Sequence, residues 1–297
     1  MPKIAFATPP LGTLVALALG LAASGCGSSR TTFAGHPSSS PAFDRTGSDP
    51  RAIEIADRVI AAAGGLDRWA AAKQIRWSQE IITEADRPPL KLEQAWDRWN
   101  GRHYLRLHTV HGDVVVLRSL YDAGGSAYAQ AGGPMQKLTD EQTEHALSDA
   151  RLRWEFDATA LLIAFLLEAP GVKLTFVGER PGKGDEPPLD EIKVAFDPRD
   201  RSRLLTYFVL VDRNTNQIAR IEIVRAGDPD TKRVGYTVAR WVEVGGLKVP
   251  TVFHNIASAN ALNLYTEITV GEPDDQLYAP VTVPHEPPEP VVRARGR

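Results

Sequence analysis

The sequence predicts an α+β fold in which a curved antiparallel sheet of about 11–12 strands wraps over a few helices. Many segments alternate apolar and polar residues, as half-buried strands do. Short turns join these segments, without the regular alternation of strands and helices that builds a parallel sheet. One segment in the middle of the chain, residues 158–168, is apolar on nearly every side. A helix of that kind must be buried on every side, so we expect the strands to enclose it.

The first 25 residues have the features of an export signal. Lys3 makes the start basic, an uncharged apolar run begins at Leu11, and small residues precede Cys26. The run is about a dozen residues long, whereas a membrane-spanning helix needs roughly 20. We therefore interpret residues 1–25 as a signal peptide. Residues 26–50 are rich in Ser, Gly, Pro and Thr and are expected to form a flexible tether.

The end of this signal, Ala23-Ser24-Gly25-Cys26, resembles the lipobox of bacterial lipoproteins. In that family the cysteine is lipidated and becomes the first residue of the mature protein. The resemblance implies that acyl chains such as palmitate on Cys26 anchor the protein in a membrane of the cell envelope. Gly27 occupies the position where an Asp favours the inner membrane in enterobacteria. We therefore expect the outer membrane, with the body in the periplasm.

The folded body is expected over residues 51–280 and begins with a helix. Asp49-Pro50 supply a cap and a first-turn proline, and Gly64-Gly65 end the first helix. A short second turn, which carries Trp69, is expected from Leu66 to Lys73. Residues 281–297 are rich in proline and are interpreted as a tail.

Two further helices are predicted in the middle of the chain. Thr139 and Gln142 form a capping box for a helix that extends to about Glu155. Asp157 is expected to cap a second, separate helix, the apolar segment 158–168.

The remaining periodic segments are predicted strands, separated by turn residues such as Asn100-Gly101 and Gly245-Gly246. They cover residues 75–81, 90–99, 102–110, 113–121, 126–130, 172–179, 189–196, 204–211, 217–225, 233–244, 247–256 and 261–270.

Composition excludes several classes of protein. The apolar content of 43% and the charged content of 24% are ordinary for a globular protein. The net charge of −3 gives no basic footprint for nucleic acid. Cys26 is the only cysteine, so the chain can form neither an internal disulfide nor a cysteine zinc site. No phosphate-loop or dinucleotide-binding motif is present, and we name no cofactor.

Three segments resemble the LolA/LolB-like superfamily of outer-membrane lipoprotein carriers. They are the turn Val211–Gln217, the turn Val244–Pro250 and the closing segment Asp274–Pro280. The resemblance extends over residues 51–280 and implies an unclosed β-barrel curved over helices, with an apolar cavity that holds acyl chains. True carriers between membranes are soluble. The tether through Cys26 instead favours a resident binder.

The candidate site is therefore an apolar cavity between the central helix and the inward-facing strand residues. Apolar lining is typical of ligand pockets, but the same residues would also form an ordinary filled core. The candidate lining residues are Trp77, Leu161, Leu162, Phe165, Leu166, Phe208, Phe253 and Leu264.

Catalytic and metal sites are not expected. The sequence contains no nucleophile elbow. His103, His108 and His111 are close in sequence, but His103 and His108 should point to opposite faces of a strand. The aspartate pairs 228/230 and 274/275 fall at turns, where Asp is common.

The leading hypothesis is a monomeric, membrane-anchored envelope lipoprotein that binds a lipid or lipoprotein acyl chain. The alternative is a non-enzymatic structural or interaction lipoprotein with a filled core. Both hypotheses use the same apolar residues, so the sequence does not separate them.

Overall fold

The structure, a computed structural model, describes residues 43–84, 86–120, 124–130, 132–182, 187–196, 205–225, 228–258 and 260–282. The predicted signal peptide, Cys26 and most of the predicted tether lie outside these residues, as does the tail from residue 283. Within the described part of the chain, no helix is long and apolar enough to cross a membrane.

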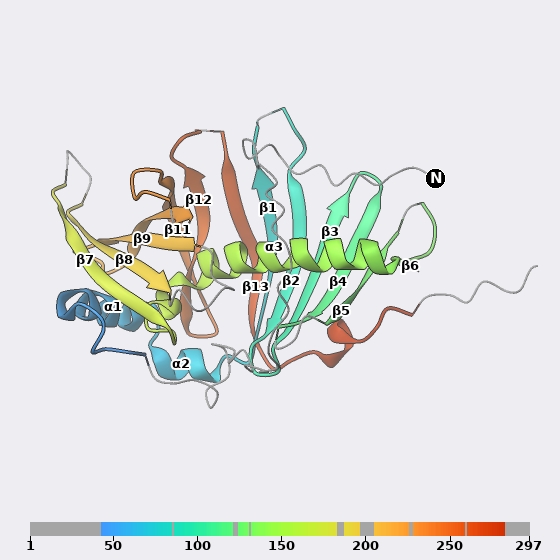
Figure 1. Cartoon of the computed structure of the whole chain (residues 1–297), viewed down its shortest axis with the longest axis horizontal. Coiled ribbons are helices and arrows are strands. Elements are labelled where there is room, and N and C mark those ends of the chain that lie inside the picture. Colours follow the sequence, from blue (N-terminus) through green and yellow to red (C-terminus); the bar gives the residue numbers. More distant parts are fainter. Residues whose placement is uncertain are drawn as a thin grey trace, which may run out of the picture.

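A single antiparallel sheet dominates the fold (Figure 1). Its strands are β1 Gln74–Ile82, β2 Leu90–Asp97, β3 Arg102–Thr109, β4 Gly112–Ser119, β5 Gly125–Ala129, β6 Gln136–Lys137, β7 Val172–Arg180, β8 Leu189–Phe196, β9 Leu205–Asp212, β10 Ile218–Arg225, β11 Val234–Val244, β12 Leu247–Asn255 and β13 Leu262–Gly271. The spatial order is β6-β5-β4-β3-β2-β1-β13-β12-β11-β10-β9-β8-β7. Because β6 and β7 are edges, the 13-stranded sheet is not closed, and the predicted fold class is confirmed.

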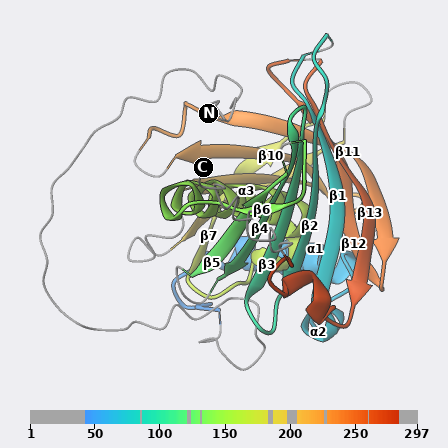
Figure 2. The same ribbon diagram turned by 90° about the vertical axis from the view of Figure 1, so that its right-hand side faces the viewer.

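The sheet bends around one long helix, α3 Asp140–Leu166. Figure 1 shows α3 running across the strands, and Figure 2 shows it almost end-on, on the concave side of the curved wall. The helices α1 Pro50–Ala62 and α2 Leu66–Ala71 lie near one end of the wall, and a short 3₁₀ turn, η1 Asp275–Tyr278, follows β13. The predicted enclosure of the central helix by strands is therefore present.

The first helix begins and ends where the sequence predicts. The Asp49 carboxylate accepts a hydrogen bond of 2.8 Å from the Arg51 amide, and Pro50 occupies the first turn. The helix stops because Gly64 and Gly65 adopt left-handed φ angles of 118° and 87°.

The middle of the chain corrects one prediction. Thr139 and Gln142 do form the capping box, but α3 continues through Asp157 as one helix with a kink at Leu162, where φ is −120° and ψ is 15°. Asp157 does not cap a second helix, because its carboxylate is bonded to glutamines of the sheet. Hydrogen bonds from Gln79 and Gln94 thus take the place of the local bond that a capping aspartate makes to a backbone amide.

The end of the predicted tether belongs to the folded body. The Asp49 amide donates a hydrogen bond of 2.9 Å to the Leu174 carbonyl, and Ser48 Oγ accepts one of 3.0 Å from the Leu174 amide. Phe43 packs against the apolar core. Residues 43–49 are therefore held against β7, because their polar groups pair with its backbone.

The apolar interior is divided along α3 into two parts. The larger core surrounds the C-terminal half of the helix, residues 158–167, and includes α1, α2 and inner residues of most strands. A smaller core lies beneath the N-terminal half, where Ala146 and Ala150 belong to one cluster with residues of β2, β3, β4 and β5, and α3 contacts β4 and β5. A layer of buried polar side chains separates the two.

Candidate ligand-binding face

Strand register arranges the concave face into rows, because residues directly opposite each other share a face. The middle row consists of Trp77, Gln94, Leu105, Val116 and Ala127. The row toward β1's C-terminal end consists of Gln79, Leu92, Leu107, Val114 and Ala129. The row on the other side consists of Ile75, Trp96, His103, Arg118 and Gly125. Apolar character is thus greatest in β2–β5 and decreases toward the His103 row.

We call the apolar part of these rows the apolar floor. It comprises buried Leu92, Leu105, Val114, Val116 and Ala127, with half-buried Ile81, Leu90, Leu107 and Ala129. The N-terminal half of α3 covers this floor mainly through two alanines, Ala146 and Ala150, and through Leu147. Because alanine side chains are short, the backbone of α3 comes close to the floor, and the helix contributes little side-chain area to cover it. The four half-buried residues leave part of it facing solvent.

A polar belt lies between the floor and the larger core. Asp157 of α3 accepts hydrogen bonds from Gln79 Nε2 at 3.0 Å and from Gln94 Nε2 at 2.8 Å. Gln79 Nε2 also bonds Asn263 Oδ1 at 2.8 Å, and Arg153 Nε lies 3.9 Å from the Asp157 carboxylate. Burial raises the pKa of Asp157 above the usual range of an aspartate. The belt therefore fixes α3 on the sheet by directional bonds.

His103 and Arg118 stand opposite each other on β3 and β4. They belong to the row of Ile75, and we call this side of the floor, near the first residues of β1 and β3, its lower end. His103 Nε2 is 3.0 Å from Gln94 Oε1. His103 Nδ1 and Arg118 Nη1 are buried and have no hydrogen-bond partner within the described chain. Burial, with the nearby Arg118 cation, lowers the pKa of His103 to about 3, so its ring is neutral at physiological pH.

Six of the eight predicted cavity residues lie together, but as members of the larger packed core. They are Trp77, Leu161, Leu162, Phe165, Leu166 and Phe253. Each is at most 5% exposed, and the Phe165 ring stacks on Trp69 with the centroids 4.8 Å apart. Around these six residues, the structure matches the filled core that the sequence left open as the alternative.

The other two predicted cavity residues, Phe208 and Leu264, face the outside of the sheet. On β9 the inner residues are Tyr207, Val209 and Val211, which belong to the larger core. On β13 the inward residue is Tyr265, which stands opposite Gln79, whereas Leu264 stands opposite Glu80. The assignment of these two residues to the concave face is wrong, because β9 is apolar on both faces and β13 is irregular near Glu267.

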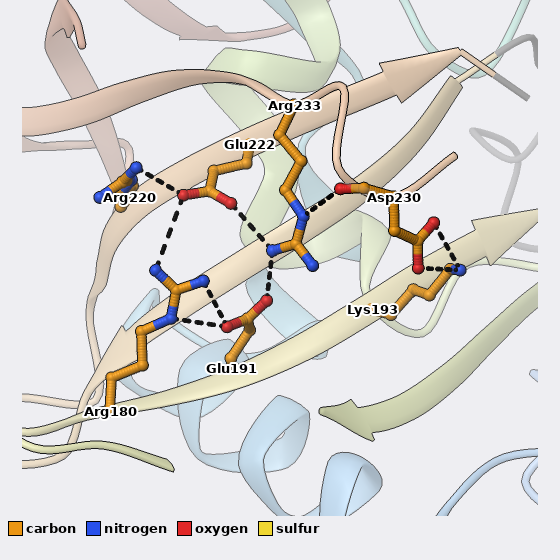
Figure 3. A network of polar contacts seen from close by, with 7 residues as sticks. All are labelled: Arg180, Glu191, Lys193, Arg220, Glu222, Asp230 and Arg233. Atoms are coloured by element: carbon orange, nitrogen blue, oxygen red, sulfur yellow. Dashed lines mark hydrogen bonds and ion pairs between the residues drawn. The ribbon is translucent and has the colours of Figure 1, made fainter. Parts of the chain in front are cut away.

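Phe208 is buried beneath a network of charges on the outer face of the sheet. Figure 3 shows the charged residues of this network. The guanidinium of Arg233 lies 3.5 Å above its ring centroid. Arg233 Nη1 bonds Glu191 at 2.5 Å and Glu222 at 2.9 Å, and Arg180 Nη2 bonds Glu191 at 2.6 Å. Because both buried carboxylates are occupied by arginines, this pair is not arranged for acid–base catalysis.

The three neighbouring histidines do not converge. His103 is buried on the inner face, whereas His108 bonds Asp113 at 2.9 Å and Glu93 at 3.1 Å on the opposite face. The predicted alternation is confirmed. Among the described residues, no group of histidines and carboxylates is placed to hold a metal ion.

A polar hollow of about 490 Å³ lies beside α1. Three arginines, Arg51, Arg58 and Arg213, surround Asp190 at distances of 3.7–3.9 Å. Asp190 stands opposite Val211 and so belongs to the concave face, but the charged lining of this hollow does not suit an acyl chain.

The belt could be foreseen only in part. Alternation along residues 75–81 already places Gln79 on the same face as Ile75 and Trp77, which signals a buried polar group. No local signal shows that Gln94 and Arg118 share this face, because their strands meet β1 only through the sheet register.

No protein-family model and no curated protein matches the chain. Solved structures of similar shape include a DUF1329 family protein from Desulfovibrio piger, at 10% identity and a TM-score of 0.48, which covers 78% of this chain and 98% of that one. They also include a LolA superfamily protein from Nitrosomonas europaea, at 8% identity and a TM-score of 0.45, over 77% and 97% of the two chains. MucB, whose complex with MucA from Pseudomonas aeruginosa is also solved, matches 79% of this chain and 65% of its own, at 14% identity and a TM-score of 0.24. The strand order itself shows the unclosed sheet over helices that the LolA/LolB-like resemblance implies.

Proposed function

We propose that this protein is a non-enzymatic lipoprotein of the cell envelope, anchored through Cys26, that binds the acyl chain of a lipid or a lipoprotein on its concave face. We expect the anchor in the outer membrane and the body in the periplasm. The binding surface is the apolar floor beneath the N-terminal half of α3, not the packed segment 158–167.

The observation that carries this proposal is the partly solvent-facing floor, which α3 covers chiefly with short alanine side chains. Its half-buried residues, Ile81, Leu90, Leu107 and Ala129, offer an apolar entrance beside the helix. Burial of a 16-carbon chain yields on the order of 12 kcal/mol, at about 0.8 kcal/mol for each methylene. Displacing Ala146, Leu147 and Ala150 from the floor costs less than that, at about 1.5–3 kcal/mol for a leucine side chain and less for each alanine.

Uptake of a fluorescent 16-carbon fatty acid tests the proposal. The chain from Gly27 to Arg297 keeps every described residue and contains no cysteine. Ala127→Cys is combined with Ala146→Cys or Ala150→Cys to link the floor to α3 by a disulfide, and two pairs are tried because all three alanines belong to one packed cluster. We expect uptake by the reduced protein, loss of uptake when the disulfide forms, and recovery with a reductant.

The single-cysteine variants are the controls, since they change the packing without linking the elements. If neither co-purified lipid in mass spectra nor uptake by the unlinked protein is found, the proposal is wrong. Equal uptake by the linked and unlinked proteins would place the binding surface elsewhere.

A second candidate function is an interaction lipoprotein with a filled core. It is favoured by the packed larger core and by Leu152 and Phe156, which stand one turn apart on α3 and are each 44% exposed. Chemical crosslinking that recovers one stable envelope protein, from a preparation without bound lipid, would support this candidate over acyl-chain binding.

A further inference from the structure

The lower end of the apolar floor contains buried polar atoms whose hydrogen bonds are not made. His103 Nδ1, Arg118 Nη1, Trp96 Nε1 and Trp77 Nε1 all lack a partner within the described ranges. They come from adjacent positions on the concave face, since Trp96, His103 and Arg118 stand side by side in one row. Buried polar groups are normally paired, so a cluster of unpaired ones calls for an explanation.

The hydrogen-bonding roles of these atoms follow from their neighbours. Gln94 Nε2 faces the Asp157 carboxylate at 2.8 Å, so Gln94 Oε1 is the atom that faces His103. Because that oxygen only accepts, His103 Nε2 carries the proton and Nδ1 presents a lone pair. The arginine and tryptophan nitrogens are donors only. The row thus offers several donors and one acceptor.

The charge at this end of the floor is positive. Burial and the neighbouring Arg151 lower the pKa of Arg118 to about 10, and the nearby carboxylate of Glu155 opposes this effect only in part. Arg118 remains a cation at physiological pH. A partly buried cation near a second arginine and one glutamate favours an anionic partner.

We infer that the Arg118–His103 end of the floor binds the acidic head group of an amphiphile, a carboxylic acid or a phosphate, whose chain lies on the apolar floor. This inference rests on the proposed function and specifies its ligand. An acidic oxygen accepts a hydrogen bond from Arg118 Nη1, and a protonated oxygen or a water donates one to His103 Nδ1. The floor extends from His103 to Leu107 along β3, roughly 13 Å at the usual rise of a strand.

Binding of four 16-carbon probes to the chain from Gly27 to Arg297 tests the head-group preference. The probes are hexadecanoic acid, hexadecyl phosphate, hexadecanol and methyl hexadecanoate. We expect the two acids to bind at least about tenfold more tightly than the alcohol and the ester, as for a charge-assisted hydrogen bond. The tighter of the two acids identifies the head group.

Substitutions at Arg118 test the assignment to this residue. Arg118→Gln should weaken binding of the acids about tenfold or more and leave hexadecanol within about threefold, while Arg118→Lys should retain most of the preference. Arg225→Gln is the matched control, because it removes the same charge from an exposed position on β10, outside the apolar floor, and should leave the preference in place.

If Arg118→Gln does not fold, the nitrogen chemical shift of His103 Nδ1 in the unsubstituted protein gives the second measurement. We expect a shift with hexadecanoic acid and a smaller one with methyl hexadecanoate. Equal affinity for all four probes, with no shift at His103, would overturn the head-group inference and leave the proposed function intact. Failure of every probe to bind would overturn the proposed function itself.

Discussion

Asp157 is the residue on which the polar belt depends. It is fully enclosed between α3 and the sheet, and both of its carboxylate oxygens accept hydrogen bonds from glutamine side chains. Tyr265 adds a bond of 3.1 Å from its hydroxyl to the Asp157 backbone carbonyl. Burial disfavours the charged carboxylate, whereas the two glutamine donors favour it.

The raised pKa of Asp157 predicts a particular dependence of stability on pH. Because the folded pKa lies above the unfolded value of about 3.9, the folded state binds the proton more tightly. The favourable contribution of Asp157 is therefore complete below about pH 4 and is lost as the pH rises through the folded pKa. In Asp157→Asn this dependence on pH should disappear. The free energy of unfolding should also fall by about 1 kcal/mol, because one hydrogen-bond acceptor is lost.

Urea unfolding of both proteins at several pH values between 4 and 7 checks this expectation. The wild type should lose stability relative to Asp157→Asn as the pH rises. Asp149→Asn, at an exposed position of α3, should follow the wild type. A difference between wild type and Asp157→Asn that stays constant over this range would contradict the burial effect.

Arg98 is a second buried residue with a definite role. Its guanidinium donates hydrogen bonds to the carbonyls of Trp69 and Ala72 and lies 3.4 Å from the Trp69 ring centroid. Burial lowers the pKa of Arg98 to about 9, which leaves it charged at neutral pH. It therefore joins the end of α2 to the end of β2.

We expect Arg98→Met to lower the free energy of unfolding by about 2–4 kcal/mol, because two helix-end carbonyls lose a charged donor. Thermal or urea unfolding measures the loss. Arg68→Met is the control, since Arg68 is exposed and donates only a 3.1 Å bond to the Gly246 carbonyl within the described structure. A similar loss in both variants would show that side-chain length, not the buried bonds, is responsible.

Among the elements, α1 ends at two glycines that differ in one physical respect. Both have left-handed φ angles, 118° at Gly64 and 87° at Gly65. A Cβ on Gly64 would collide with the Gly246 carbonyl oxygen, whereas a Cβ on Gly65 would meet nothing within 4 Å. The pair therefore separates backbone strain from steric contact.

Gly65→Ala should cost about 1–3 kcal/mol of stability, because φ 87° and ψ 162° lie in a region of backbone angles that essentially only glycine adopts. Gly64→Ala should cost clearly more, because the turn at Gly246 must also move. Equilibrium unfolding in urea compares the two. Equal losses would mean that the contact with Gly246 relaxes without cost.

The elements also show where prediction from the sequence succeeds. The caps at Asp49 and Thr139 and the stop at Gly64-Gly65 involve residues close in the chain, and all three are present. Asp157 has a capping residue's chemistry but bonds two glutamines distant in sequence. The sequence therefore predicted two helices where one helix runs through.

For the whole molecule, short turns correctly predicted an antiparallel sheet, and only the two-residue strand β6 was missed. The faces of β9 and β13 were not predictable in the same way. β9 is covered on one face by the core and on the other by the charges above Phe208. Its residues are therefore apolar on both faces, and no alternation of apolar and polar residues shows which face points inward. In β13 the positive φ of Glu267, 51°, accompanies an irregular register.

The same limits apply to the candidate site. The sequence correctly predicted that apolar strand residues would face an enclosed helix. The sequence placed the binding surface around residues 161–166. In the structure, Trp69 and residues of α1 pack against this segment and fill the space around it. The apolar floor lies instead beneath the N-terminal half of α3. Its position depends on how far α3 extends along the sheet.

Hydrogen exchange with and without hexadecanoic acid tests most directly that an acyl chain binds beneath α3. On the chain from Gly27 to Arg297, we expect slower exchange in residues 140–156 of α3 and in β2–β5 when the acid is bound. We expect no change in α1 or in β8–β10, which lie outside the floor. Saturating acid that leaves α3 and β2–β5 unchanged, or slows exchange only elsewhere, would contradict the account.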